Sequence, residues 1–201
     1  MRRLFVAGIV SLLLGIIVFN FFAFSPRGLR ITNLSDQSAT ISWFTTGNGK
    51  EKVFVSTSNW KVIIPLLRNF LSESFQEDET SKTHYVTIKN LSPEKKYYFG
   101  LSGSIVPNFF VTKSPSQEFK LPMPAYGLIM NSDRKTNTKR AILYFNDSFS
   151  TVTNESGGWS FDLSRLPVFP PLVIEVISKN SGTAKVTVNN NFQPVPTIYL
   201  K

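Results

Sequence analysis

Short segments in which apolar and polar side chains alternate are the feature that most constrains how this chain can fold. Alternation with a period of two residues is typical of strands that bury one face. Such segments occur at 38–46, 96–102, 141–145, 159–163, 172–176, 186–188 and 198–200. They are separated by turn signals such as Gly47-Asn48-Gly49. The pattern predicts an all-β chain built from β-sandwiches.

Residues 4–24 form an uncharged apolar run that follows Arg2 and Arg3. A helix rises about 1.5 Å per residue, so a run of this length spans the roughly 30 Å hydrocarbon core of a bilayer. The run ends in Phe21-Phe22-Ala23-Phe24, where a cleaved signal peptide has small residues. We therefore expect an uncleaved signal anchor, with a cleaved and secreted form as the alternative. The two arginines favour a cytoplasmic N-terminus and place the rest of the chain outside.

The alternating pattern lapses at 121–125, where two prolines favour an extended connector. We interpret the chain as a transmembrane helix followed by two tandem β-sandwich domains. The predicted parts are the membrane helix at 1–24, the first domain at 25–120, the linker at 121–125 and the second domain at 126–201. Each domain is long enough for a small sandwich core.

An insertion at about 60–80 interrupts the strand pattern of the first domain. After Pro65, the apolar residues of 66–78 fall at helical spacing, which predicts a short helix or a structured loop between strands. Phe70 and Phe75 lie in this insertion. If its apolar face stays exposed, these two side chains are the best candidates for partner binding in the first domain.

Four segments of the first domain carry a resemblance to a known family. They read LRITNL at 29–34, SATISW at 38–43, THYVTIKNLSP at 83–93 and YYF at 97–99. These segments resemble the fibronectin type III fold, particularly the variant that precedes the catalytic domain of purple acid phosphatases. The resemblance implies that Trp43 is a core tryptophan and that Tyr97, after Leu91 and Pro93, forms a tyrosine corner. It does not imply phosphatase activity, because no set of Asp, Asn and His metal ligands follows.

A second resemblance covers roughly residues 124–201. The segments at 126–129, 141–145 and 151–161 resemble the carboxypeptidase-regulatory-like, transthyretin-like β-sandwich family. A threonine-containing strand, a glycine turn and an aromatic–x–aromatic strand form the recognisable core of that family. The resemblance puts Gly157 and Gly158 in a tight hairpin, where they would supply positive φ, and Trp159 in the core.

The chain has no cysteine and one histidine, which excludes several kinds of chemistry. Without cysteine there is no disulfide, thiolate metal site or Cys nucleophile, and one histidine excludes a multi-His metal centre within the chain. His84 shares strand parity with Val86 and Ile88, so we interpret it as a packed, inward-facing residue. The enzymatic alternative is a residual hydrolase that uses His84 with a nearby Ser or Asp. We predict a non-enzymatic protein without cofactor or metal.

The net charge of +9 is spread along the chain. Residues 25–120 hold 12 basic and 8 acidic groups, and residues 121–201 hold 8 and 5. Basic residues are concentrated at 134–140, which makes Arg134 and Lys135 candidate interaction residues. Nucleic-acid binding requires a dense basic stripe with interleaved aromatics, so we expect no nucleic-acid partner. Diffuse positive charge fits attraction to anionic envelope polymers or lipid head groups.

These features predict a bacterial cell-envelope protein, anchored in the membrane by 4–24, that displays two binding or structural modules outside. The absence of cysteine in an exported chain favours a bacterial source. The expected partner is an envelope protein or glycan, bound through loops and strand edges in adhesion or a related interaction. The alternative is an accessory subunit of an envelope secretion or pilus-type assembly. In that case Gly8 and Gly15 would let the membrane helix approach partner helices closely.

Overall fold

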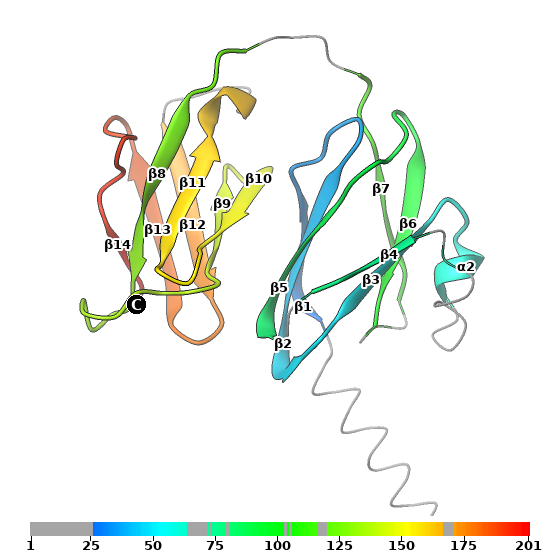
Figure 1. Cartoon of the computed structure of the whole chain (residues 1–201), viewed down its shortest axis with the longest axis horizontal. Helices are drawn as coiled ribbons and strands as arrows, with labels where there is room; N and C mark the ends of the chain where they lie inside the picture. The colour runs from blue at the N-terminus through cyan, green and yellow to red at the C-terminus, as the bar shows by residue number, and fades with distance from the viewer. Residues whose placement is uncertain are drawn as a thin grey trace, which may run out of the picture. The chain divides into compact units, whose positions relative to one another are not determined.

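The computed structural model describes residues 26–63, 72, 74–78, 81–102, 104, 106–115, 120–166 and 171–201, and their regular elements are almost all strands (Figure 1). The strands are β1 (Arg27–Thr32), β2 (Ala39–Gly49), β3 (Lys52–Ser56), β4 (Ser74–Glu77), β5 (Ser81–Ile88), β6 (Lys96–Leu101), β7 (Asn108–Val111), β8 (Pro124–Met130), β9 (Ile142–Phe145), β10 (Phe149–Val152), β11 (Gly158–Asp162), β12 (Leu172–Ser178), β13 (Gly182–Val188) and β14 (Ile198–Tyr199). The helices described are α2 (Trp60–Ile63) and the 3-10 turn η1 (Leu163–Arg165). The all-β prediction is confirmed for this part of the chain.

The membrane helix predicted at 4–24 lies outside the described residues. The α-helix α2 has four residues. Within the ranges given above, no helix has the length and apolarity needed to cross a membrane.

Residues 26–115 fold into two sheets, with strand orders β1-β2-β5 and β4-β3-β6-β7. Alternate side chains of a strand point to the same face. Ala39, Ile41 and Trp43 share one face of β2 and are fully buried, and Thr40, Ser42 and Phe44 on its other face are buried as well. Val53 of β3 and Phe99 of β6 are also fully buried. These two sheets, of three and four described strands, make this part of the chain a β-sandwich.

The short helix or structured loop predicted at 66–78 does not extend to its last residues, which form a strand. Ser74–Glu77 forms strand β4, which pairs antiparallel with β3 and places Gln76 opposite Val53. Pairing with β3 satisfies the backbone groups of the segment, and this tertiary gain outweighs a helical spacing of apolar residues. The described part of helix α2 covers Trp60–Ile63. Phe70 lies outside the described residues.

The chain has two compact units. One contains Trp43–His84 and Tyr97–Phe109, and the other contains Arg30–Ser42, Tyr85–Lys96 and Phe110–Lys201. Strands β2 and β5 each have residues in both units.

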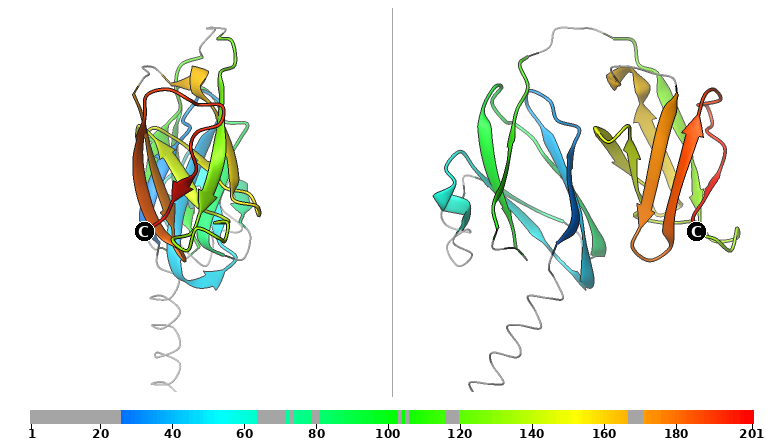
Figure 2. Two further views of the ribbon diagram at one scale, coloured as in Figure 1. Left: turned by 90° about the vertical axis from the view of Figure 1, so that its left-hand side faces the viewer. Right: turned by 180° about the vertical axis from the view of Figure 1, so that it is seen from behind.

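The last part of the chain folds into a second pair of sheets, with strand orders β10-β9-β12-β13 and β11-β8-β14 (Figure 2). Strand β8 begins at Pro124, so the predicted linker is too long by two residues. A proline is tolerated there because the first residue of a strand need not donate to the ladder. β14 pairs parallel with β8, opposite Ile129 and Met130.

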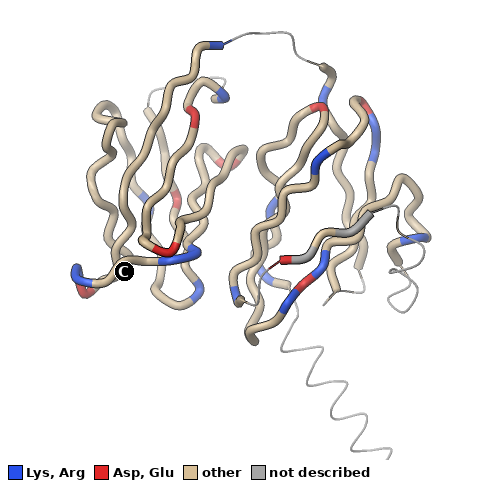
Figure 3. The backbone as a smooth tube through the Cα atoms, in the orientation of Figure 1, with Lys and Arg blue, Asp and Glu red and all other residues tan. Residues whose placement is uncertain are grey.

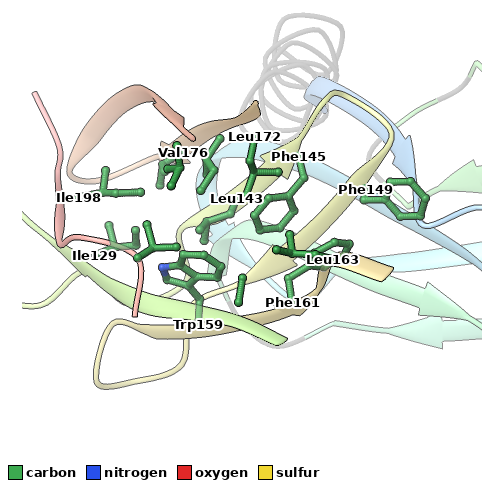
Figure 4. Packing of buried hydrophobic residues seen from close by; sticks show 14 of the residues in the cluster. Ile129, Leu143, Phe145, Phe149, Trp159, Phe161, Leu163, Leu172, Val176 and Ile198 are labelled. Atoms are coloured by element: carbon green, nitrogen blue, oxygen red, sulfur yellow. The ribbon is translucent and has the colours of Figure 1, made fainter. Parts of the chain in front are cut away.

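Aromatic rings from both sheets fill the core of this second sandwich (Figure 4). Phe145 of β9 stacks on Phe161 of β11, with ring centroids 4.4 Å apart. Trp159, also from β11, lies 5.7 Å from Phe145 and is 5% exposed. These contacts join the two sheets across the core, and offset or tilted ring pairs of this kind add stability beyond their buried area.

Gly157 and Gly158 were both predicted to supply positive φ in the turn before β11. The structure has positive φ at one of them. Gly157 has φ of +72°, in the left-handed region. Gly158 lies outside that region and is the first residue of β11. The side-chain oxygen of Asn154 accepts hydrogen bonds from the N–H groups of Ser156 and Gly158, both at 2.9 Å. This side chain closes the turn, so a second left-handed residue is not needed.

Candidate functional site

The side chains predicted to be structural lie where a core role requires. Trp43, Leu91, Tyr97 and Trp159 are buried, and Pro93 is half-buried. None of the four buried side chains is available to a partner.

His84 is completely buried and sits between a carboxylate and a hydroxyl. Its Nδ1 lies 3.1 Å from Oδ2 of Asp78, and its Nε2 lies 3.0 Å from Oγ1 of Thr45. The ring stacks on Trp43, with centroids 4.9 Å apart. An Asp–His–hydroxyl series is the arrangement of a hydrolase triad, which is the enzymatic alternative raised by the sequence.

The surroundings of Thr45 favour a structural role for this series. Thr45 is completely buried, and its hydroxyl donates to the carbonyl of Gly47 at 2.8 Å. A nucleophile must reach substrate and must give its proton to the histidine. The Thr45 hydroxyl is out of reach of solvent, and its proton is engaged on Gly47. The series therefore satisfies buried polar groups of the first sandwich.

Replacing Asp78 by asparagine is expected to destabilise the first sandwich by about 1–3 kcal/mol, because an uncharged amide replaces the acceptor of a buried hydrogen bond. The measurement is the urea midpoint of the full-length chain by pulse proteolysis, with first-sandwich fragments identified by mass. Asp147→Asn is the control, since the side chain of Asp147 is 89% exposed. Equal midpoints for the two variants would contradict a stabilising role for Asp78.

The basic loop predicted to interact with partners is ordered by its own polar groups. The guanidinium of Arg134 lies over the ring of Tyr199, 5.1 Å from its centroid, and Lys135 is exposed. Hydrogen bonds from the Thr136 hydroxyl and from the N–H groups of Thr136 and Lys135 lower the pKa of the Asp133 carboxyl. Phe75, the other described candidate, belongs to β4 in the other unit. The loop thus presents Lys135 while Arg134 is engaged with Tyr199.

A cleft opens along one edge of the second sandwich, between β13 and the chain that leads into β14. The two are held together at one end by backbone hydrogen bonds between Thr183 and Lys201, at 3.2 and 3.0 Å. Gly182 permits this approach, because a Cβ at its position would clash with the carbonyl oxygen of Lys201. The cleft lies at the other end, where β13 finishes and the chain loops round to β14, and its volume is about 280 Å³.

The cleft has an aliphatic floor and a polar, uncharged rim. The floor consists of Val186, Val188, Val195, Pro196 and Ile198. Three consecutive asparagines and two threonines complete the lining, namely Asn189, Asn190, Asn191, Thr187 and Thr197. Lys and Arg are spread along the chain (Figure 3), but no charged side chain lines this cleft. A concave site with apolar walls and a few polar groups is the usual form of a small-molecule site.

One wall of the cleft is fixed by hydrogen bonds to β8. The N–H of Val195 donates to the carbonyl of Tyr126 at 2.7 Å, and the N–H of Tyr126 donates to the carbonyl of Phe192 at 3.1 Å. The side-chain amide of Gln193 donates to the carbonyl of Pro124 at 2.7 Å. The wall is therefore built before any ligand arrives, which reduces the ordering cost of binding.

Sequence reasoning did not single out the cleft residues or Asp78. Three adjacent asparagines directly after an alternating strand were the available signal for the rim. The sequence gave no comparable sign of the floor, because its valines and isoleucine have the pattern of ordinary core residues of strands. Asp78 lies in the acidic stretch 77–79, and nothing in the sequence links it to His84.

No protein-family model matches this chain, and no curated protein sequence matches it. Among solved structures, a computer-redesigned β-sandwich protein is similar over 45% of this chain and 96% of its own, with 21% identity and a TM-score of 0.34. The central fibronectin-III array of RIM-binding protein is similar over 85% of this chain and 65% of its own, with 17% identity and a TM-score of 0.33. The FN1–FN3 domains of chicken CNTN1 are similar over 83% of this chain and 66% of their own, with 16% identity and a TM-score of 0.31.

The strand orders and buried side chains define the class of protein. The described residues form an all-β chain with two β-sandwiches, the second of which has an open cleft at one edge.

Proposed function

We propose that this chain is a non-enzymatic, membrane-anchored cell-envelope protein that displays two β-sandwich modules outside the cytoplasmic membrane and binds an envelope partner. The apolar run at 4–24 would anchor it, and the modules would face outward. The resemblance of the second module to the carboxypeptidase-regulatory-like family belongs to this proposal. Its two sheets, of four and three strands, agree with that family's sandwich architecture.

The observation that carries the proposal is the cleft between β13 and β14. Its wall is fixed to β8, and its rim offers hydrogen-bonding groups that the second sandwich does not use within itself. A binding module requires such a surface on a rigid scaffold. The buried position of the Asp78–His84–Thr45 series supports the non-enzymatic part of the proposal.

The proposal predicts that the full-length chain stays in the membrane fraction after alkaline carbonate washing. Added protease should digest its modules in bacterial spheroplasts and leave a cytoplasmic marker protein intact. Removing residues 1–24 should shift the chain to the soluble fraction, because the membrane anchor is lost. A membrane-bound deletion variant would contradict anchoring by 4–24. Modules protected in intact spheroplasts would contradict outward display.

A further inference from the structure

We propose that the cleft between β13 and β14 binds an acetamido sugar, as one residue of an uncharged envelope glycan. This inference rests on the proposed function and names the partner of the same module. It is carried by the chemistry of the cleft lining: an aliphatic floor, an amide and hydroxyl rim, and no charged side chain.

The rim suits a ligand that both donates and accepts hydrogen bonds. The side chains of Asn189, Asn190 and Asn191 each offer two N–H donors and a carbonyl acceptor, and Thr187 adds a hydroxyl. Their side chains make no hydrogen bond to the part of the chain that the structure describes. Sugar hydroxyls and an acetamido group present matching donors and acceptors. Asn191 has φ of 61°, a conformation that asparagine tolerates and that turns the chain round the end of the cleft.

The apolar floor of the cleft favours a sugar with an acetamido methyl over a sugar with a hydroxyl in the same place. Val195 and Ile198 are almost completely buried, so the apolar surface open to a ligand comes from the half-buried Val186 and the exposed Pro196. An acetamido methyl placed on these side chains removes apolar surface from water, whereas a hydroxyl in the same place loses hydrogen bonds. The uncharged lining also disfavours acidic sugars, since a carboxylate would find no cation to pair with.

The size of the cleft limits what it can enclose. Its 280 Å³ is a little below the roughly 300–1,000 Å³ of sites for drug-sized ligands. One sugar ring with its acetamido group is therefore the appropriate occupant, and neighbouring sugars of a chain would extend into solvent. A ligand of this size is expected to bind with a Kd on the order of 1 mM.

The test is saturation-transfer NMR of the full-length chain in a detergent without a sugar head group. The probe is the β-1,4-linked trimer of N-acetylglucosamine, and cellotriose is the matched probe that has the same linkage without acetamido groups. We expect the strongest transfer at the acetyl methyl protons, and at least about tenfold weaker binding of cellotriose.

Two rim variants test the site itself. Asn189→Ala with Asn190→Ala removes two amides, and Thr187→Val removes one hydroxyl at nearly constant shape. Each should weaken binding of the trimer, the double variant by about tenfold or more. Asn180→Ala is the control, because Asn180 is an exposed asparagine at the opposite end of the β12–β13 pair. Unchanged urea midpoints establish that the variants are folded.

Three outcomes would overturn the inference. They are absence of transfer to the trimer, equal binding of cellotriose, and rim variants that bind as well as the Asn180→Ala control. If a protein partner occupies the cleft instead, the first of these outcomes results. None of them bears on membrane anchoring or outward display, which the fractionation and protease experiment tests separately.

Discussion

Trp43→Ala is expected to unfold the first sandwich or to leave it marginally stable. The indole is fully buried and stacks on His84, and its Nε1 is buried with no hydrogen-bond partner among the described residues. Its contribution therefore comes from packing. Deleting a buried tryptophan side chain costs roughly 3–5 kcal/mol, from lost burial and from the cavity that remains. The total free energy of unfolding of a domain of this size is about 5–15 kcal/mol, so this loss is a large share of its stability.

The measurement is the urea midpoint of the full-length chain in detergent, followed by pulse proteolysis that reports the first-sandwich fragments. Trp60→Ala is a matched control, because Trp60 is 56% exposed in α2. Surface substitutions of this kind usually change stability by less than about 0.5 kcal/mol. A midpoint for Trp43→Ala equal to that of the control would contradict the core role of Trp43.

Gly157→Ala is expected to destabilise the second sandwich by about 2–5 kcal/mol. A left-handed backbone costs a residue with Cβ roughly 1–3 kcal/mol, and a forced contact adds a similar amount. The Cβ would lie 2.6 Å from the carbonyl oxygen of Ile129. That oxygen accepts a hydrogen bond from Thr138, and the N–H of Ile129 donates to Gly157, so the backbone has little room to move.

Gly158→Ala is the control for Gly157→Ala. It replaces a glycine of the same turn whose backbone is not left-handed. Gly158 lies outside the left-handed region, and a Cβ there would meet the side chain of Asn154 at 3.3 Å. This contact requires only a small shift of the Asn154 side chain, which can keep its hydrogen bonds to Ser156 and Gly158, so we expect a much smaller loss, about 1 kcal/mol or less. The urea midpoint of the second sandwich is the readout for both variants. Equal losses would show that the turn does not depend on the conformation of Gly157.

The strands themselves were predictable because alternation reports burial directly. The run of Ala39, Ile41 and Trp43 predicted one buried face, and all three side chains are buried in β2. The parity of His84 with Val86 likewise predicted an inward side chain. Such predictions need only the geometry of one strand, in which successive side chains point to opposite faces.

Pairing between distant segments was not predictable in this way. Residues 74–77 were predicted as part of a short helix or a structured loop, yet they pair with β3 as strand β4. This pairing leads into Asp78, whose carboxylate reaches His84, six residues further along the chain. The local pattern carried no information on the partner strand, and the partner strand decided both the structure of the segment and the role of the acid.

The sequence by itself determined the all-β class, the residues that face inward on β2, β5 and β6, and the lack of cysteine chemistry. These depend on residue type and on a period of two, both local properties. The tertiary structure alone decided the His84 contacts and the cleft. The cleft exists because β13 and β14 are tied together at Thr183 and Lys201 and separate where the asparagines follow. A cavity depends on how strands end and which edges meet, and neither is encoded in the alternation within one strand.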